Sequence, residues 1–308
     1  MSDFNSPKDL LNAYRKGFNG AICDPEETAT LLGELKTPLF GAAAYRLYGS
    51  GEGKLSLPYK SLLKFDPKFG ASERQTTGDC VSHATRNAVD VTRAVEIDVK
   101  GESESFEARS ATEGIYQSRT NSGQGMTCSN AAKYVSTQGG ILLRKNYGAI
   151  DLSTYNSNLG ANKTIPQSIW IEEAKKHQVK TISMITTVQE ARDALANGYG
   201  ISVCSGYGFS SKRDGNGIAE RSSGWNHAMC WIACDDTRSK FKEMLFLVQN
   251  SWGLWNSGPR VHDQPEGSFW IREKEARGML AEQGSWVFSN VDGFPAKDLP
   301  DYGTSSFL

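Results

Sequence analysis

The sequence predicts an α+β protein in which a helical lobe is followed by an antiparallel β lobe. Three observations support this fold class. Stretches with the apolar spacing of helices come mostly in the first part of the chain, and stretches with strand character come mostly later. The 308 residues, 38% of them hydrophobic, are enough for one large domain or for two lobes that share an interface. A strong helix is expected to begin at Cys80.

The first 55 residues are interpreted as an N-terminal extension, residues 1–55. Asp24 suits the N-cap of a helix, Pro25 suits its first position, and the two acids that follow favour its positive end. These features predict a helix that ends near residue 36. The glycine-rich stretch 49–53 then predicts a loop or linker.

The helix that begins at Cys80 has Asp79 as a suitable N-cap and Gly78 before it, where the chain can approach closely. Its apolar face is formed by Ala84, Ala88, Val91 and Val95. Further helices are predicted over residues 110–119, 127–134 and 166–177. The Gly139-Gly140 pair is expected to stop the second of these.

Strands are predicted in the second half of the chain, over residues 179–185, 201–205, 228–233, 245–249 and 268–272. A capping box of Thr187 and Glu190 predicts one more helix between the first two strands, ending at Gly198. Residues 283–308 are rich in Gly, Pro, Asp and Ser, which predicts an extended tail that wraps the body or a partner. The chain is therefore divided into an extension, a main domain over 56–275, and a helix end with a tail over 276–308.

Composition argues against several classes of partner. The net charge of −1 does not indicate a nucleic-acid-binding surface. No apolar stretch approaches the roughly 18 residues of a membrane-spanning helix. The polar residues 1–11 do not resemble a signal peptide. The six cysteines are therefore expected to be reduced thiols in the cytoplasm or another reducing compartment, five of them as small buried groups.

Cys80 is the candidate nucleophile. A free thiol, with a pKa of about 8.5, is a weak nucleophile, and a helix N-terminus or a neighbouring imidazolium would activate it. The sequence offers the helix N-terminus directly. A buried structural cysteine is the alternative for Cys80 considered alone.

His227 and Asn250 supply what such a thiol needs. His227 begins an apolar strand, and period-two alternation places Met229, Trp231 and Ala233 on its face and Cys230 and Cys234 on the other. Asn250 follows a second apolar strand. Its side-chain carbonyl could hold the second imidazole nitrogen, with Trp252 shielding that hydrogen bond from water.

The motifs GDC, NHA and QNSWG, in the order Cys, His, Asn, resemble those of the papain family of cysteine peptidases. The segments GMTCSNAAKYVSTQGGILL and EGSFWIRE are also similar, so the resemblance covers roughly residues 56–275. It implies a catalytic domain whose central helix begins at Cys80. That helix would pack on an antiparallel, barrel-like β lobe, with a cleft between the two lobes.

The resemblance also implies roles for individual residues. Cys80 would be the nucleophile, His227 the base and Asn250 the residue that orients the base. The Cys80 N–H would be one oxyanion donor. Candidate substrate-binding residues are Gly123 and Gly125, which would pair with an extended peptide, together with Ala228 and Trp252 beside the base. No metal or organic cofactor is expected, and the substrate would be a peptide or protein.

The sequence departs from the family at several positions. The family's second oxyanion donor is a glutamine six residues before the nucleophile, where this chain has Arg74; Gln75 is the candidate, one residue closer. Thr77 replaces a half-cystine of the family, which agrees with a reducing compartment. The N-terminal extension does not resemble the family's inhibitory pro-segment, which argues against a secreted zymogen, although it could still cover the cleft.

Three other interpretations compete with the peptidase. Cys80 with His83, and His227 with Cys230 and Cys234, have spacings typical of metal ligands, but strand alternation turns both cysteines away from His227. An amidase or peptidoglycan hydrolase of the same fold is a second alternative. The third is a papain-like domain kept as a structural or binding component of a larger assembly, such as a virus particle. In that case the two terminal extensions would bind a protein partner.

Overall fold

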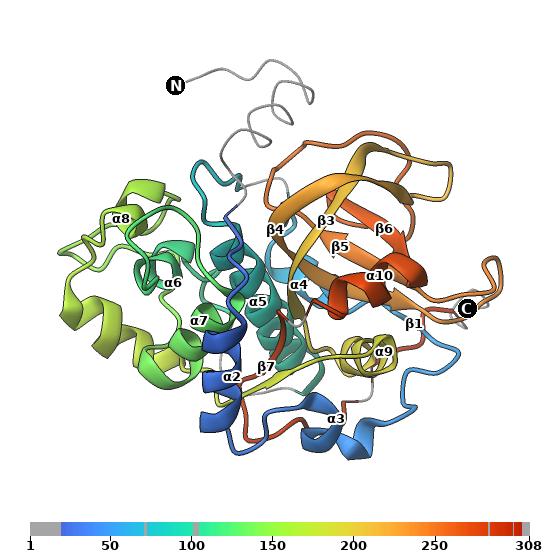
Figure 1. The fold of residues 1–308 in the computed structure, drawn as a ribbon, viewed down its shortest axis with the longest axis horizontal. Helices are drawn as coiled ribbons and strands as arrows, with labels where there is room; N and C mark the ends of the chain where they lie inside the picture. The colour runs from blue at the N-terminus through green and yellow to red at the C-terminus, as the bar shows by residue number, and fades with distance from the viewer. Residues whose placement is uncertain (1–19, 71–72, 101–104, 283, 298, 304–308) are drawn as a thin grey trace.

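The computed structural model describes residues 20–70, 73–100, 105–282, 284–297 and 299–303. A group of short helices lies on one side and a twisted sheet on the other, with the long helix α5 (Cys80–Lys100) between them (Figure 1). The α+β class is therefore confirmed. The polar residues 1–11 and the last five residues of the predicted tail lie outside the described residues.

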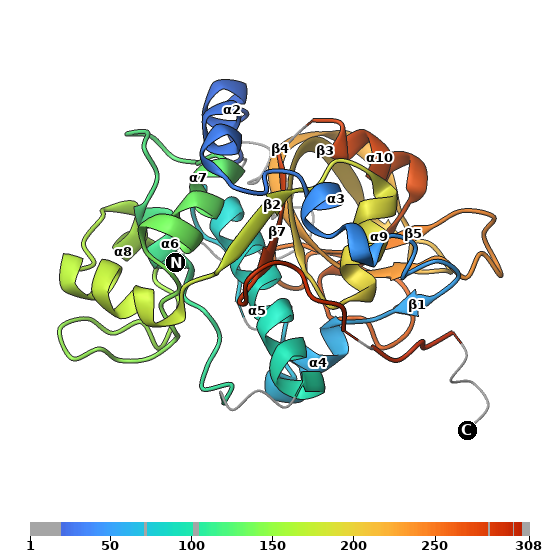
Figure 2. The same ribbon diagram turned by 90° about the horizontal axis from the view of Figure 1, so that it is seen from below.

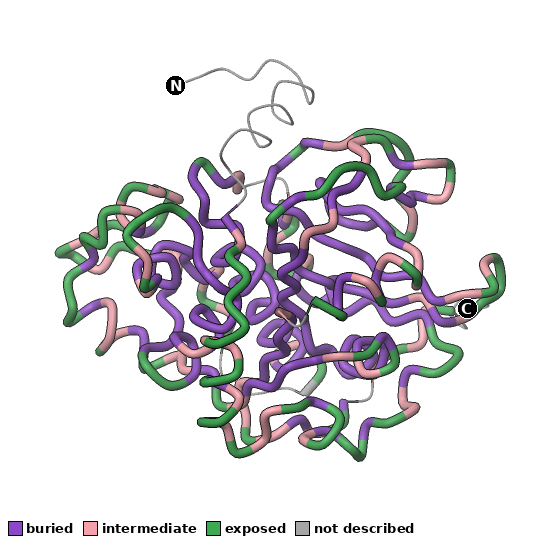
Figure 3. The backbone as a smooth tube through the Cα atoms, in the orientation of Figure 1, coloured by how far each residue is buried: buried purple, intermediate pink, exposed green. Residues whose placement is uncertain are grey.

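Helix α5 begins at the residue predicted from the sequence. Its apolar residues Ala84, Ala88, Val91 and Val95 are at most 2% exposed, because the helix is packed on both sides. Figure 3 shows the tube buried through this central region and exposed mainly at the periphery. The N-terminus of α5, and with it Cys80, is thereby held inside the molecule.

The helical lobe is built from short elements, of which α4, α6 and α7 pack on α5 and α8 packs on α6, seen from below in Figure 2. Thr127 caps α7 with its hydroxyl, as the predicted start near this residue implies, and Gly139 follows the lobe's π-helical turn η2. Where one helix is predicted over 166–177, the chain forms a π-helical turn and a 3-10 turn. The elements are α4 (Tyr59–Phe65), α6 (Thr112–Gln117), α7 (Cys128–Lys133), η2 (Tyr134–Gln138), α8 (Ser157–Ala161), η3 (Ser168–Glu173) and η4 (Ala174–His177).

The described strands form one antiparallel sheet in the order β2-β7-β3-β4-β5-β6, with β1 paired to β4. The predicted strands over 245–249 and 268–272 have the predicted bounds, whereas those at 201 and 228 extend into long strands. The strands are β1 (Leu55–Ser56), β2 (Thr181–Met184), β3 (Ile201–Arg213), β4 (Ala219–Asp235), β5 (Leu245–Gln249), β6 (Ser268–Arg272) and β7 (Ser285–Ser289).

A register shift in β4 overturns part of the predicted alternation. Met229 and Trp231 face one hydrophobic cluster, and Cys230 faces the other, as period two requires. Between Trp231 and Ala233 the pairing with β5 shifts, so Ala233 joins Cys230 and Cys234 joins Trp231. An extra residue in one strand exchanges the faces of all residues beyond it.

The N-terminal region is well integrated with the rest of the chain. Helix α2 (Pro25–Glu34) has Asp24 as its N-cap, whose carboxylate accepts a hydrogen bond from the Glu27 N–H, as predicted. It packs on α7 of the helical lobe. Two short helices, α3 (Phe40–Ala43) and η1 (Tyr45–Leu47), precede the predicted loop at 49–53, which forms turns. Helix α9 (Val188–Ala196) carries the predicted capping box.

The predicted extended tail contains a buried strand. After α10 (Glu273–Leu280), residues Ser285–Ser289 form β7, which lies between β2 and β3 inside the sheet. The sequence SWVFS has the aromatic and β-branched residues that strands prefer, but the Gly, Pro and Asp around it hid this signal. Residues 285–289 are thus part of the sheet, not of a tail.

Because of this position, Trp286→Ala is expected to reduce the free energy of unfolding by about 3–5 kcal/mol, the usual effect of removing a buried tryptophan side chain. Trp286 is 0% exposed in β7. Tyr48→Ala is the control, because Tyr48 is 85% exposed and its removal should change stability by no more than about 0.5 kcal/mol. Denaturant unfolding measures both. Equal losses for the two variants would contradict the assignment of β7 to the core.

The prediction that all six cysteines are reduced is wrong for one pair. Cys128 and Cys204 form a disulfide that closes a sequence separation of 76 residues. Cys230 and Cys234 are buried thiols, as expected, but Cys23 is exposed. Spacing alone could not reveal the pair, because the fold brings together residues from α7 and β3.

Helices in the described part of the chain are all too short or too polar to cross a membrane.

Candidate active site

Cys80 lies at the first position of α5 and is 0% exposed. The backbones of Ala228 and Gly20 lie close enough to its sulfur to favour the thiolate and so lower the pKa of the thiol. Ala228 directly follows His227 in β4, so the thiol of the helical lobe contacts the strand that carries the candidate base. The fold therefore brings the start of α5 to the part of β4 that carries His227.

His227 and Asn250 are joined by a hydrogen bond of 2.8 Å between Nε2 and Oδ1. The N–H of Ser251 also donates to Asn250 Oδ1, at 2.7 Å, which identifies this atom as the amide oxygen. An amide oxygen accepts, so Nε2 of a neutral His227 must carry the proton. Nδ1 is then the basic nitrogen, and it is buried without a hydrogen-bond partner. This is the tautomer that a general base requires.

Three tryptophans surround the His227–Asn250 pair. The Trp252 ring lies 4.7 Å from the imidazole centroid, as the predicted shielding role requires, and Trp225 lies 6.0 Å away. Trp255 packs on both Trp252 and Trp225. Trp252 and Trp255 are at most 1% exposed. Because water is excluded here, the hydrogen bond that orients the base is stronger than it would be in solvent.

Gln75 is buried and contacts the residues that directly follow Asn250. Its side-chain oxygen accepts hydrogen bonds from the Ser251 hydroxyl and the Trp252 indole N–H. Its side-chain nitrogen donates to the Thr77 carbonyl at 2.8 Å. Arg74 forms a backbone bridge to Trp252. Of the two candidate positions, therefore, the glutamine at 75 has its side chain fixed between the nucleophile loop and Asn250–Trp252.

Burial keeps both reacting groups neutral in this state. Loss of solvent raises the pKa of the Cys80 thiol to about 12; hydrogen bonds from Ala228 and Gly20 oppose the shift and the Asp79 carboxylate adds to it. Loss of solvent also lowers the pKa of His227 to about 4, although the Asn250 hydrogen bond opposes this shift. At neutral pH the pair is therefore a thiol and an imidazole, not the thiolate and imidazolium that react fastest.

The cause of this burial is a segment of the N-terminal extension, Gly20–Ile22, which we call the bridging segment. It runs parallel to the chain at Met126: the Met126 N–H donates to the Gly20 carbonyl, and the Ile22 N–H donates to the Met126 carbonyl. On its other side the Ala21 N–H donates to the Asn226 carbonyl in β4. The bridging segment thus joins the two lobes directly over Cys80 and beside His227.

Glycines make this close approach possible. A Cβ atom on Gly20 would lie 2.0 Å from the Gly78 carbonyl oxygen, and one on Gly125 would lie 2.7 Å from the Gly20 carbonyl oxygen. Gly125 also has φ +88°, which favours glycine. Gly125 therefore contacts the bridging segment where a peptide was predicted to bind. Gly123 is exposed and its carbonyl accepts from Arg119, so the structure does not bring Gly123 to the same place.

A buried charged network lies beneath the nucleophile. Asp79 accepts a hydrogen bond from the Tyr155 hydroxyl at 2.7 Å and lies 3.5 Å from His83 Nε2. His83 is 0% exposed and faces Glu73 and Arg86 on its other side. Burial alone would raise the pKa of Glu73, but Arg86 and Arg144 hold it well below its usual range. His83 is thus a partner of this network.

The metal-site alternative finds no matching arrangement. Among the residues that the structure describes, no group of three or more His, Cys, Asp or Glu side chains could hold a metal ion. The Cys230 thiol donates to the Trp231 carbonyl, within the sheet. Cys234 lies in the hydrophobic cluster on the other face.

Asp79→Asn is expected to increase the reactivity of Cys80. A negative charge beside a thiol disfavours the thiolate, so its removal should lower the pKa of Cys80 and raise the alkylation rate at pH 8 by about tenfold, one pKa unit. The measurement is the pH profile of alkylation in a chain lacking residues 1–23. Tyr155→Phe removes the hydrogen bond to Asp79 but keeps the Asp79 charge, so the alkylation rate should depend on pH as it does in the parent chain. A profile unmoved by Asp79→Asn would contradict this role.

The sequence analysis missed several residues of the site. The bridging segment carries no motif, and its position depends on pairing with Met126 across more than a hundred residues. Trp225 and Asn226 directly precede His227 in the sequence, and this adjacency is the signal that could have identified them as residues of the site. The disulfide cysteines gave no local signal.

Comparisons with known proteins concern the fold of the chain. No family model and no curated protein matches the sequence. Among solved structures, the cysteine protease xylellain from Xylella fastidiosa is similar with a TM-score of 0.56 and 15% identity, over 90% of this chain and 97% of that one. Procathepsin B S9 from Trypanosoma congolense is similar with a TM-score of 0.55 and 11% identity, over 92% of this chain and 90% of that one. The chain therefore has the fold of the papain-like cysteine proteases.

Proposed function

We propose that this protein is a papain-like cysteine endopeptidase in a latent form. Cys80 is the nucleophile, His227 the base and Asn250 the residue that orients it. The observation that carries the proposal is the His227–Asn250 hydrogen bond, which leaves a basic, unpartnered Nδ1 on the strand that contacts the Cys80 sulfur. The T. congolense structure is described as a procathepsin, and a precursor form would suit a chain whose own segment covers the nucleophile.

The reaction follows from these groups once the bridging segment has left. His227 Nδ1 takes the thiol proton, and the Cys80 thiolate attacks the peptide carbonyl carbon. The Cys80 N–H, and the second proton of the Gln75 amide, would stabilise the oxyanion. His227 then protonates the leaving amine as the C–N bond breaks. Water, deprotonated by His227, hydrolyses the thioester and releases the acid.

Selective labelling tests the proposal. In a chain lacking residues 1–23, an epoxide or iodoacetamide probe should modify Cys80 faster than it modifies free cysteine between pH 5 and 8. The reason is that an imidazole partner promotes formation of the thiolate. Peptide-resolved mass spectrometry identifies the modified cysteine. If Cys80 reacts no faster than free cysteine over this pH range, Cys80 is not an activated nucleophile and the proposed peptidase activity is refuted.

One observation favours the alternative, a structural or binding component without activity. Cys80 and His227 are both 0% exposed, and the bridging segment is hydrogen-bonded on both sides. A domain kept only for binding would retain this closed state. The two candidates differ in the labelling experiment: the binding component would leave Cys80 unreactive even after residues 1–23 are removed.

A further inference from the structure

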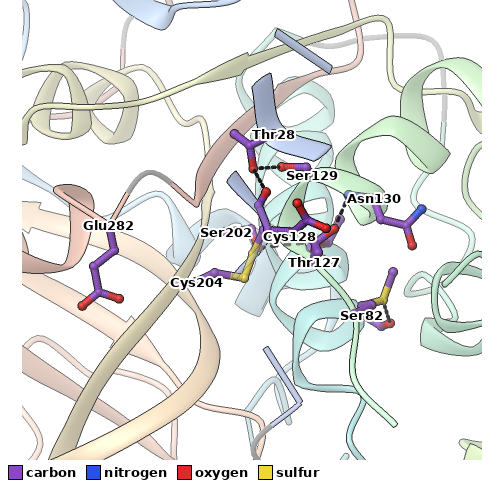
Figure 4. Close-up of a disulfide and its surroundings, with 12 residues drawn as sticks. Thr28, Ser82, Thr127, Cys128, Ser129, Asn130, Ser202, Cys204 and Glu282 are labelled. Atoms are coloured by element: carbon purple, nitrogen blue, oxygen red, sulfur yellow. Dashed lines mark hydrogen bonds between the residues drawn. A yellow bond between two sulfur atoms is a disulfide. The ribbon is translucent and has the colours of Figure 1, made fainter. Parts of the chain in front are cut away.

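The Cys128–Cys204 disulfide connects the two lobes of the protein (Figure 4). Cys128 is the first residue of α7 in the helical lobe, and Cys204 lies in β3 of the sheet. Their Cα atoms are 6.2 Å apart. Helix α7 also packs on β3 and β7. The bridging segment adds backbone hydrogen bonds to both lobes.

The disulfide is attached to both walls that hold the candidate site. In the pairing of β3 with β4, Cys204 lies opposite Ala228 and Ser205 lies opposite His227. On the other wall, Cys128 follows two residues after Met126, whose N–H and carbonyl both bond to the bridging segment. A short covalent path therefore joins the backbone at Met126 to β3, and the pairing of β3 with β4 extends this connection to His227.

The disulfide is also reachable from outside. It forms part of the wall of a cavity of about 630 Å³ that Thr127, Ser205, Asn226 and Glu282 also line. Cys204 retains 9% of its surface, whereas Cys230 is 0% exposed. Figure 4 shows the Glu282 carboxylate on the opposite side of this space from Thr127 and Ser129. A small dithiol can enter a cavity of this size, and the buried thiols offer no such route.

We propose that the Cys128–Cys204 disulfide is a redox clamp that keeps the two lobes at the separation at which the bridging segment docks over Cys80. Reduction by a dithiol breaks the S–S bond. Two electrons and two protons pass to Cys128 and Cys204, which become thiols, and the reductant becomes a disulfide. The lobes can then separate, and the bridging segment loses the support of Asn226.

This inference rests on the proposed function, because it assigns a control to the same site. It also links the state of the site to the predicted reducing compartment. In such a compartment the clamp would be open and the nucleophile would become accessible. Under oxidising conditions the protein would remain closed. The contacts of α2 with α7, including Thr28 with Ser129 and Glu27 with Thr127, lie within one lobe and would survive either state.

The test measures the rate at which iodoacetamide modifies Cys80 in the full chain, resolved by peptide mass spectrometry. The oxidised wild type should react slowly. The double variant Cys128→Ser/Cys204→Ser should react about tenfold faster or more, because opening no longer has to occur against a cross-link. Cys23→Ser removes an exposed thiol that is not part of the clamp, and it should keep the slow rate. Rates of the double variant and wild type within about twofold of each other would overturn the proposal.

A second measurement avoids dependence on the variant's folding. Wild-type protein is equilibrated in a series of dithiothreitol redox buffers, and the Cys80 rate should rise together with the fraction of reduced Cys128–Cys204. A rate that stays flat through this transition overturns the clamp. Gly20→Leu distinguishes the clamp from the proposed function. If Cys80 reacts in Gly20→Leu but does not react in the reduced wild type, only the clamp is overturned. If Cys80 does not react in Gly20→Leu either, both the clamp and the proposed function are overturned.

Discussion

Gly20→Leu should expose the nucleophile and raise the alkylation rate of Cys80 at pH 7.5 by about a hundredfold or more, because the pKa of the thiol would return toward its ordinary value. Gly20 lies so close to the Gly78 carbonyl that a Cβ atom would come within 2.0 Å of its oxygen. The contact is with backbone, so a leucine side chain cannot be accommodated by a rotamer change. The bridging segment must leave, and water then reaches Cys80 and His227.

The sign of the pH effect follows from the two shifts. In the closed state the pKa of Cys80 is raised to about 12 and that of His227 is lowered to about 4, both chiefly by burial. Rehydration stabilises the thiolate and the imidazolium together, so the two values move toward each other. The rise of the alkylation rate with pH should therefore begin at lower pH in Gly20→Leu than in the wild type.

Gly33→Leu provides the matched control. Gly33 lies on the exposed side of α2, and a Cβ atom there would meet nothing within 4 Å. The same substitution at this position should leave both the alkylation rate and the pH profile at the wild-type values. If Gly20→Leu also reacts at the wild-type rate while remaining folded by circular dichroism, the bridging segment does not control access to Cys80.

How much of this arrangement the sequence could reveal depends on the range of the interactions. The start of α5 at Cys80 is encoded locally, by Gly78-Asp79 and an apolar face, and the helix begins at that residue. The bounds of β5 and β6 follow from continuous apolar runs between polar turns. The motifs around His227 and Asn250 predict that these two residues meet, and a hydrogen bond joins them.

Features that depend on contacts between distant parts of the chain could not be predicted from local sequence patterns. Strand β7 was missed because its neighbours β2 and β3 lie about a hundred residues earlier, and the local composition favours a tail. The disulfide and the bridging segment were missed for the same reason: Cys128 with Cys204, and Gly20 with Met126, meet only in the folded chain. The register shift in β4 has no signature in the alternation of apolar residues, so the face of Cys234 was predicted wrongly.

Substitutions in the candidate triad should separate chemistry from orientation in the Gly20→Leu background. Cys80→Ala removes the atom that attacks the carbonyl, and His227→Ala removes the group that carries the proton. Each should reduce kcat/KM on a peptide substrate by about 10⁴-fold or more, since the members of such a unit are not independent. Asn250→Ala leaves both reacting groups in place and removes one buried hydrogen bond, with an expected loss of about ten- to a hundredfold, or 1–3 kcal/mol.

The Asn250 variant has a second expected signature, which a general loss of stability would not produce. Without the Oδ1 acceptor, the proton of neutral His227 is no longer held on Nε2, so part of the population carries it on Nδ1 and cannot act as the base. The loss should therefore appear in kcat with KM little changed, whereas Cys23→Ser should change neither. Equal activity of Cys80→Ala and its parent would refute the triad, because the variant lacks the sulfur that attacks the carbonyl in the proposed reaction.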